Sequence, residues 1–211
     1  MARRLNLSKS TVHRLVQTLA EDGFLEKNTV TRRYRLGWNL LQLSDIVMNY
    51  MSIFREAFPV IESLAKKWGG AVHIGVVESP NPAPLLSYIG KRNPASCTSG
   101  GKIILAYQPA KYLDVILKTR FPHCGPRAIT CPNLFRRHLK DIRQQGYVIS
   151  VNELHKGVVS IAAPIQDHTG RVVAAITLAG PTERIPKNRI PAICDDILLH
   201  SRNISRFLGS F

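Results

Sequence analysis

The sequence predicts an α+β chain in two parts: a short, basic helix and hairpin, and a longer domain in which helices flank a mainly antiparallel sheet. Two observations lead to this prediction. Apolar residues recur at helical spacing between residues 12 and 19, just before a hairpin rich in arginine. From residue 71 onward the apolar pattern changes to the alternation typical of strands, broken by turn signals and by further helices.

The first element is a helix that begins after Ser8, whose hydroxyl can accept a hydrogen bond from a first-turn amide. One stripe of this helix is apolar and is expected to be buried. It consists of Val12, Leu15, Val16 and Leu19. The exposed N-terminal part carries hydroxyl and cationic side chains, the types that contact phosphates and base edges in the major groove. These are Lys9, Ser10, Thr11, His13 and Arg14.

A hairpin follows, after Gly23 ends the helix in the left-handed position that glycine favours. Residues 24–27 and 32–36 are expected to be its strands, joined by a turn. The cations of the return strand suggest a wing that holds the sugar-phosphate backbone. They are Arg32, Arg33 and Arg35. An ordinary amphipathic helix with a solvated hairpin is the alternative, and the combination of cap, stripe, glycine and cations favours DNA binding.

Length and charge limit the possible classes of protein. The 211 residues suffice for one large or two small domains, and the net charge of +15 favours nucleic acid over a membrane surface as a partner. Residues 1–36 hold eight Lys and Arg against three acidic residues, and the remainder is basic too. The sequence contains neither an apolar run near the ~18 residues that span a bilayer nor a signal-peptide core. A soluble cytoplasmic protein without a membrane partner is therefore expected.

Residues 37–52 are expected to form a linker helix that is apolar on more than one side. Its apolar residues are Leu40, Leu41, Leu43, Ile46, Val47, Tyr50 and Met51. Such a helix is unstable alone in water, so it either pairs with its counterpart in a dimer or packs back onto its own domain. Both alternatives remain open at the level of sequence.

The longer domain begins with a helix that ends at Gly69-Gly70, in which Pro59 marks a kink or the start of a new helix. Strands are expected over residues 71–77, 85–89, 147–151, 158–165 and 172–178, a loop over 81–84, and helices over 101–107, 109–118 and 133–145. A closing helix carries Ile193, Ile197, Ile204 and Leu208. Together these elements predict a domain of about 160 residues in which helices flank the sheet.

The cysteines give little reason to expect a metal or a cofactor. Cys97, Cys124, Cys131 and Cys194 form no CxxC pair, and reduced thiols are the rule in a cytosolic protein. His123 with Cys124 and Cys131 has loose metal-like spacing, but a fourth ligand does not stand out. No metal ion and no cofactor are therefore expected.

The segment LSKSTVHRLVQTLAEDGFLE followed by RRYRLG resembles the winged helix-turn-helix of the IclR family of bacterial transcription regulators. In this comparison, residues 1–6 are similar to the end of the second family helix, so a complete first helix is expected to be missing. Arg32 stands where the family often has glycine, which is expected to alter the turn and add a phosphate contact. The resemblance implies a DNA-binding domain over residues 1–36, the linker helix, and a GAF/profilin-like effector-binding and oligomerisation domain over residues 53–211.

Two further stretches resemble effector-binding motifs of this family. Residues 95–102 resemble its CTA-GKA loop, where small residues before a helix leave backbone amides free for a carboxylate. Residues 150–165 with 176–181 resemble its D-x-E, C/S-x-A-x-P and SxSGP motifs, and strand alternation directs Ser160, Ala162 and Pro164 to the same face as Thr177 and Ala179.

The resemblance implies that the matching positions line a pocket for a small organic acid. They are Cys97, Thr98, Ser99, Gly100, Ser150, Asn152, Glu153, Ser160, Ala162, Thr177 and Ala179. Ser150 replaces an acidic residue and Ala179 replaces a serine, which indicates a less polar effector or one bound differently. The alternative is that the small residues only allow a helix to pack closely on the sheet.

Three functions remain after this comparison. The favoured one is a transcription regulator, a homodimer or homotetramer on a pseudo-palindromic operator, controlled by a small organic acid. The second is a metabolite sensor that oligomerises without binding DNA on its own. The third is an enzyme that uses Cys97, which is disfavoured because His73 and His155 lie far away in sequence and lack an orienting acid.

Overall fold

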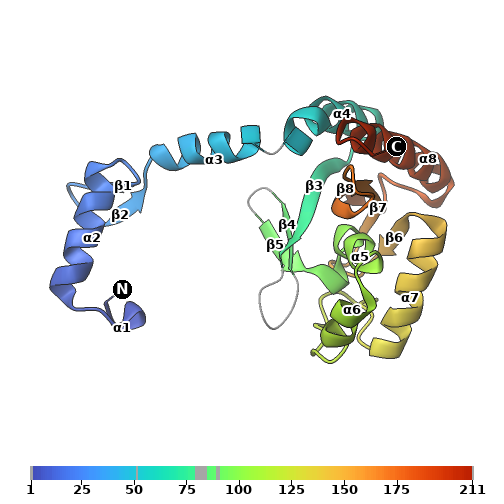
Figure 1. The fold of residues 1–211 in the computed structure, drawn as a ribbon, viewed down its shortest axis with the longest axis horizontal. Helices are drawn as coiled ribbons and strands as arrows, with labels where there is room; N and C mark the ends of the chain where they lie inside the picture. The colour runs from blue at the N-terminus through green and yellow to red at the C-terminus, as the bar shows by residue number, and fades with distance from the viewer. Residues whose placement is uncertain (1, 51, 79–84, 89–90, 211) are drawn as a thin grey trace. The chain divides into compact units, whose positions relative to one another are not determined.

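The computed structural model describes residues 2–50, 52–78, 85–88 and 91–210 (Figure 1). The chain forms two compact units, Met1–Arg55 and Glu56–Phe211. Three parts of the sequence prediction lie outside the described residues. They are the loop over residues 81–84, Met51 of the linker helix and Ile89 of the second strand.

The first unit contains two helices of 13 and 12 residues, one helix of four residues and a pair of short strands. They are α1 (Ala2–Leu5), α2 (Lys9–Glu21), β1 (Leu25–Lys27), β2 (Tyr34–Leu36) and α3 (Asn39–Tyr50). Ser8 caps α2 as expected, because its hydroxyl accepts from the Thr11 amide at 3.1 Å. Gly23 adopts φ +69° after the helix, which turns the chain into β1, and β1 pairs antiparallel with β2.

The expected burial of the apolar stripe on α2 is wrong. None of the α2 residues, all of which the structure describes, is buried, and Leu15 and Leu19 are 50% and 42% exposed. The reason is the small amount of structure that accompanies α2 in the described part of this unit. A four-residue helix and strands of three residues cannot cover a helix of thirteen.

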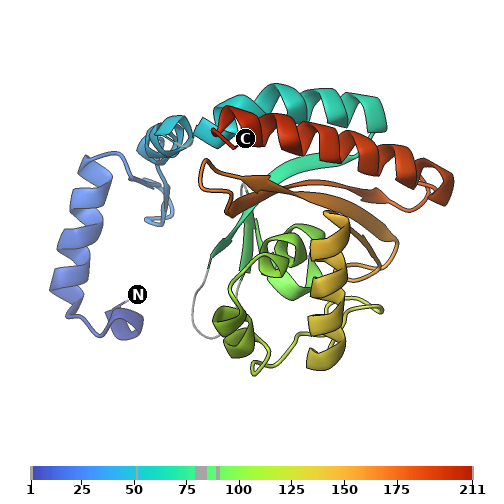
Figure 2. The same ribbon diagram turned by 45° about the vertical axis from the view of Figure 1, so that its right-hand side comes forward.

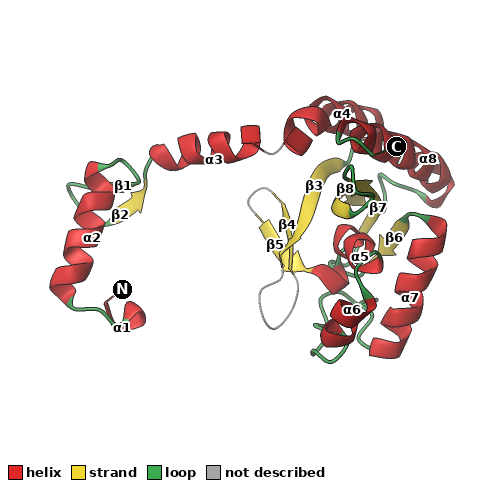
Figure 3. Cartoon of the chain, in the orientation of Figure 1, coloured by secondary structure: helices red, strands yellow, loops and turns green. Residues whose placement is uncertain are grey.

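The second unit is an α+β domain (Figures 2 and 3). Its strands are β3 (Ala71–Glu78), β4 (Leu85–Tyr88), β5 (Lys91–Pro94), β6 (Val148–Val151), β7 (Val158–Gln166) and β8 (Val172–Pro181). Its α-helices are α5 (Ser99–Ala106), α6 (Ala110–Ile116), α7 (Pro132–Gln145) and α8 (Ile190–Phe207), with short 3-10 turns at Ala95–Cys97 and Lys187–Arg189. Helix α4 (Ser52–Trp68) leads into the unit and continues through Pro59 without ending there.

The described strands of this unit form one antiparallel sheet in the order β5-β4-β3-β8-β7-β6. The β5 edge strand is a strand that the sequence pattern did not predict, because Lys91–Pro94 has little apolar character. Helices α4 and α8 lie on one face of the sheet and α5, α6 and α7 on the other (Figure 2). The Trp68 indole donates to Asp196 at 2.8 Å and so joins α4 to α8.

The core on the α5 side is apolar and closely packed. Ile103 and Leu105 of α5, Phe135 and Ile142 of α7, and Ala162 of β7 are all fully buried in it. A domain of this size can bury enough apolar surface to be stable by itself. The core therefore holds the N-terminal end of α5 in a fixed position above the sheet.

The register of the sheet brings distant residues into two rows on this face. Ser150 pairs with Ser160, which pairs with Ala179, and these residues form the first row. Ala162 pairs with Thr177, which pairs with His73, and these form the second. The predicted shared face of the β7 and β8 residues is confirmed, because partners in an antiparallel pair point the same way.

Candidate DNA-binding face and effector cavity

The N-terminal end of α2 presents its polar side chains to solvent. All of the residues expected there to contact DNA are exposed: Lys9, Ser10, Thr11, His13 and Arg14. The Ser8 hydroxyl lies 2.8 Å from those of both Ser10 and Thr11, so the start of the helix is a small cluster of hydroxyl groups. Such a surface can donate to phosphates and to base edges.

The turn between β1 and β2 is held by Asn28. Its side-chain oxygen accepts from the amides of Val30 and Thr31 at 3.0 and 2.7 Å. Arg32 has φ +58°, the left-handed region, so this arginine occupies the conformation that a glycine would take. The expected change of turn shape at this position is therefore not required, and the exposed Arg32 side chain is an addition to the wing.

The cations of the wing differ in their surroundings. Arg35 pairs with Glu26 on the neighbouring strand, with an N–O distance of 2.5 Å, although its side chain is 76% exposed. Arg32 and Arg33 are exposed and form no ion pair with a described residue. The charge of Arg35 is thus partly compensated, whereas Arg32 and Arg33 keep their full charge for a phosphate.

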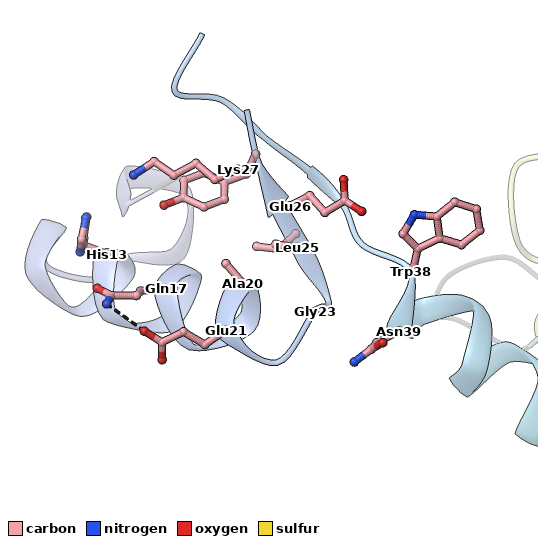
Figure 4. A pocket seen from close by; sticks show the side chains of 11 residues that line it. His13, Gln17, Ala20, Glu21, Gly23, Leu25, Glu26, Lys27, Trp38 and Asn39 are labelled. Carbon is pink, nitrogen blue, oxygen red and sulfur yellow. Dashed lines mark hydrogen bonds between the residues drawn. The ribbon is translucent and has the colours of Figure 1, made fainter. Parts of the chain in front are cut away.

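A shallow groove of about 730 Å³ lies between α2 and β1 (Figure 4). Its apolar floor includes Ala20 and Leu25, and its rim is polar, with Gln17 donating to Glu21 at 2.9 Å. Trp38, also on the rim, is 73% exposed. The groove has the same cause as the exposed stripe on α2, namely that little described structure packs on this helix.

The second unit contains a smaller and better enclosed cavity of about 70 Å³, between the start of α5 and the sheet. Its lining residues come from β3, α5, β6, the β6–β7 loop, β7 and β8. They are His73, Thr98, Ser99, Gly100, Ser150, Glu153, Leu154, Val158, Ser160, Thr177 and Ala179. Pockets for drug-sized molecules measure roughly 300–1,000 Å³, so this cavity suits a ligand with few non-hydrogen atoms.

The wall of this cavity is rich in polar atoms without protein partners. Among the described residues, four buried side-chain oxygens lack a hydrogen-bond partner in the protein, and all four belong to residues that line the cavity. They are Ser99 Oγ, Ser150 Oγ, Glu153 Oε2 and Thr177 Oγ1. Buried polar atoms are normally hydrogen-bonded, so their gathering around one cavity indicates a site for a polar molecule.

The α5 helix adds backbone donors to the same cavity. The Thr98 hydroxyl caps the helix by accepting from the Gly101 amide at 3.1 Å. The amides of Ser99 and Gly100 lie in the first turn, where the helix itself supplies no acceptor. This end of the helix also carries partial positive charge, so it favours an anionic or carbonyl oxygen.

A buried ion pair joins the cavity-lining residue Glu153 to Lys102. Lys102 is fully buried, and its ammonium nitrogen lies 2.5 Å from Glu153 Oε1 and 3.2 Å from His138 Nε2. Burial lowers the pKa of Lys102, while the contact with Glu153 opposes that shift. Burial, with the Lys102 charge adding to it, lowers the pKa of His138. The neighbouring imidazole is thus kept neutral beside the ammonium.

Cys97, Asn152 and Ala162 were expected to line the effector site, but they lie outside the cavity lining. The Cys97 thiol donates to the Pro122 carbonyl at 3.4 Å. Asn152 is used in the loop, where its side-chain oxygen accepts from the Gly157 amide at 2.6 Å. Ala162 belongs to the apolar core under α5, although its sheet partner Thr177 lines the cavity.

The Cys97 thiol is poorly suited to be a nucleophile. Burial, together with the neighbouring Cys124, raises the pKa of Cys97 to about 12. A thiol of this kind is protonated at neutral pH, whereas nucleophilic cysteines have a lowered pKa. Among the described residues, no three His, Cys, Asp or Glu side chains gather in a way that could hold a metal ion.

His73, Leu154 and Val158 line the cavity but were not chosen from the sequence. His73 was considered only as a distant base, because its place beside Thr177 depends on the pairing of β3 with β8. Leu154 and Val158 carry no polar group, so their residue types do not indicate a binding site. For Val158, the position after Gly157 and close to Ser160 of the motif was a signal that could have found it.

Acidification is expected to destabilise the second unit through His73. Burial lowers the pKa of His73 to about 4, and the charge of Lys91 adds to the shift. An unfolded histidine titrates near 6.5, so between pH 6.5 and 4 the unfolded state binds more protons than the folded state. The free energy of unfolding should therefore fall by up to about 1.4 kcal/mol per pH unit in this window. Urea titrations at several pH values give the free energy of unfolding as a function of pH. This dependence on pH should be weaker in His73→Gln, and an unchanged dependence would contradict the assignment.

An exposed basic helix with a wing, joined to an α+β domain that encloses a polar cavity, defines a DNA-binding regulator with its own ligand-sensing domain. The chain belongs to the IclR family of bacterial transcription regulators. Residues 46–206 match the family model for the IclR C-terminal domain, and residues 1–29 match that for the IclR helix-turn-helix domain. The curated relatives that match the chain include named transcription regulators, in agreement with the family model.

The similarity extends along the whole chain. The glycerol operon regulatory protein of Streptomyces coelicolor is 29% identical, and the match covers 100% of this chain and 87% of that protein. The crystal structure of the Thermotoga maritima IclR is 26% identical with a TM-score of 0.79, and covers 99% of this chain and 89% of that one. An IclR homologue from Microbacterium hydrocarbonoxydans, solved in complex with 4-hydroxybenzoate, shares the fold at 24% identity and a TM-score of 0.83, covering 98% of this chain and 88% of that one.

Proposed function

We propose that a small organic acid bound in the 70 Å³ cavity controls DNA binding by α2 and the wing. The observation that carries this proposal is the gathering of four unpartnered, buried polar oxygens around that cavity, as counted over the described residues. An acid carboxylate would lie at the first-turn amides of Ser99 and Gly100. The hydroxyls of Ser99, Ser150 and Thr177 would satisfy its remaining polar atoms.

The relatives support an effector of this kind. A solved homologue holds 4-hydroxybenzoate, an organic acid. The test is a titration of this chain, bound to labelled duplex DNA, with a panel of short carboxylic acids. We expect at least one acid to change the DNA affinity, and we expect this response to be smaller in Ser99→Ala. Binding that never responds to any acid of the panel would contradict the proposal.

The proposed DNA contacts are those of the exposed α2 side chains and the wing. The α2 helix would read the major groove through Lys9, Ser10, Thr11, His13 and Arg14, while Arg32, Arg33 and Arg35 would contact the backbone. The operator is proposed to be pseudo-palindromic and the chain a cytoplasmic homodimer or homotetramer. Leu41, Leu43 and Ile46 on α3 are 60%, 47% and 50% exposed, and burial against a second copy would remove this apolar surface from water. Within the described residues, no helix is both long and apolar enough to cross a membrane.

Replacing wing and helix residues should separate backbone contacts from base contacts. Arg33→Ala is expected to weaken binding to all sequences alike and to reduce the slope of log affinity against log salt by about 0.9. Thr11→Ala is expected to change sequence preference with little change in that slope. Fluorescence anisotropy on duplexes selected from a random pool measures both quantities.

Arg35→Ala is the control for this comparison. The ion pair with Glu26 already compensates part of the Arg35 charge, so its loss should change the salt slope less than the loss of Arg33. Equal effects of Arg33→Ala and Thr11→Ala on affinity, slope and preference would count against the assignment of these contacts.

A second candidate function is a sensor that binds metabolite and oligomerises but does not bind DNA by itself. The observation that favours it is that no residue of α2, whose full length is described, is buried. A gel shift of this chain with the selected duplexes decides between the candidates. No shift at low salt, together with effector binding, would establish the sensor.

A further inference from the structure

We infer that Glu153 makes the cavity selective for short acids that carry a hydroxyl group, over their deoxy and oxo analogues. This inference rests on the proposed effector role of the cavity and specifies the class of effector. The evidence is the position of the two carboxylate oxygens of Glu153, which lie in different surroundings.

One oxygen of Glu153 is occupied by the protein. Oε1 lies 2.5 Å from the Lys102 ammonium, and both residues are buried, with Glu153 only 7% exposed. The other oxygen, Oε2, is buried without a hydrogen-bond partner among the described residues, and Glu153 lines the cavity. Gly125 and Arg127 hold the loop in place, because their amides donate to the carbonyls of Glu153 and Asn152 at 2.8 and 3.0 Å.

The chemistry of Oε2 is then restricted to accepting a hydrogen bond. If the shared proton lies on the Lys102 nitrogen, both oxygens of Glu153 are acceptors. If it lies between the nitrogen and Oε1, Oε2 is still an acceptor. A ligand must therefore present a donor at this position, since an acceptor placed there would repel Oε2.

The neighbouring charge decides which donor is suitable. A cationic amine would approach the buried Lys102 ammonium, and like charges in a buried site oppose each other. A hydroxyl group donates without adding charge, so it fits this wall of the cavity best. Another part of the lining, the start of α5, offers amide donors from Ser99 and Gly100 and suits a carboxylate.

The size of the cavity limits the distance between these two groups. At about 70 Å³, it accommodates only a few non-hydrogen atoms. A carboxylate and a hydroxyl on adjacent or nearly adjacent carbons satisfy both parts of the lining within this volume. The effector class is therefore the short aliphatic hydroxy acids.

The test compares acids that differ in one group, using the complete chain. Lactate, propionate and pyruvate share a three-carbon acid skeleton and carry a hydroxyl, a hydrogen or an oxo group at the second carbon. Calorimetric titration is expected to give at least about tenfold tighter binding for one lactate enantiomer than for propionate or pyruvate, because a site built to bind a hydroxyl disfavours analogues without it. Similar affinities for the three acids would overturn the inference while leaving the proposed effector site intact. Failure of all three acids, together with glycolate and glycerate, to bind would overturn both.

Glu153→Gln tests whether this residue is the source of the preference. Lys102 needs an acceptor, so the amide oxygen of the glutamine should face Lys102 and its NH₂ group should face the cavity. The variant is then expected to lose the preference for lactate, with pyruvate binding as well as or better than lactate. A retained tenfold preference in a variant with a native-like circular dichroism spectrum would overturn the role of Glu153.

Ser150→Ala is the matched comparison within the same cavity. Its hydroxyl lies on β6 and can both donate and accept, so it does not distinguish a hydroxyl from an oxo group. This variant should bind all three acids more weakly with the ratio of their affinities preserved. If Ser150→Ala loses the preference for lactate and Glu153→Gln keeps it, Ser150 and not Glu153 determines selectivity. That result would overturn the inference.

Discussion

Replacing Lys102 with methionine is expected to lower the free energy of unfolding of the second unit by about 3–5 kcal/mol. The substitution removes one member of a fully buried ion pair and leaves the Glu153 carboxylate without its 2.5 Å partner. An unpaired buried charge is costly because the interior does not replace the water that the charge has lost. Urea denaturation followed by circular dichroism at fixed protein concentration measures the change.

A second substitution separates the loss of the pair from the loss of packing. In Lys102→Met with Glu153→Leu, neither charge is buried, so most of the lost stability should return. The control is Lys66→Met. Lys66 pairs with Glu62 at 2.7 Å on the surface of α4, and the loss of this exposed pair should cost at most about 0.5 kcal/mol. Equal losses for Lys66→Met and Lys102→Met would show that burial of the pair has no energetic consequence.

Gly37→Ala is expected to weaken DNA binding by at least about a hundredfold, equivalent to about 3 kcal/mol. A β-carbon at this position would lie 2.1 Å from the Gly23 carbonyl oxygen, a backbone atom that cannot move without disturbing the end of α2. The Gly37 amide also donates to the Phe24 carbonyl at 2.8 Å, and the Asn39 amide donates to Gly23. The alanine would therefore separate α2 from the wing.

The measurement is DNA affinity by anisotropy, together with the thermal unfolding of the second unit. The neighbours of Gly37 in this clash lie in the first unit, so unfolding of the second unit should be unchanged. Gly69→Ala is a suitable control, because its added β-carbon meets no atom within 4 Å. That variant carries only the cost of φ +68° in a residue other than glycine, roughly 1 kcal/mol or somewhat more, and should bind DNA normally. Unchanged DNA affinity in Gly37→Ala would mean that the helix and wing need not be joined.

Local features of the fold were largely predictable from the sequence. The Ser8 cap, the end of α2 at Gly23 and the strand β7 follow from residue type and periodicity over a few positions. Burial was less predictable. The apolar pattern of α2 identifies the face that other elements would cover, but it does not show whether such elements are present. The same limit applies to Lys91–Pro94, which became a strand by pairing with β4 and not through its own pattern.

The candidate effector site was predictable in outline. The resemblance of two short motifs led to Ser99, Ser150 and Thr177, and the structure places all three around one cavity. It did not distinguish them from Asn152 and Ala162, which belong to similar motifs but are used by the loop and by the core. Ala162 points to the same face as Ser160 and Thr177, so only the packing of distant segments decides which residues of that face line the cavity.

The sequence by itself determined the basic, hydroxyl-rich start of α2, the cationic wing and the face shared by Ser160 and Thr177, because each depends on periodicity and residue type within short segments. Tertiary structure alone decided that Lys102 pairs with Glu153 across 51 positions, that His73 lies opposite Thr177, and that Glu153, with its unpartnered Oε2, lines a cavity. The physical reason is that strand register and burial are set by contacts between distant segments, and no local pattern of residues contains them.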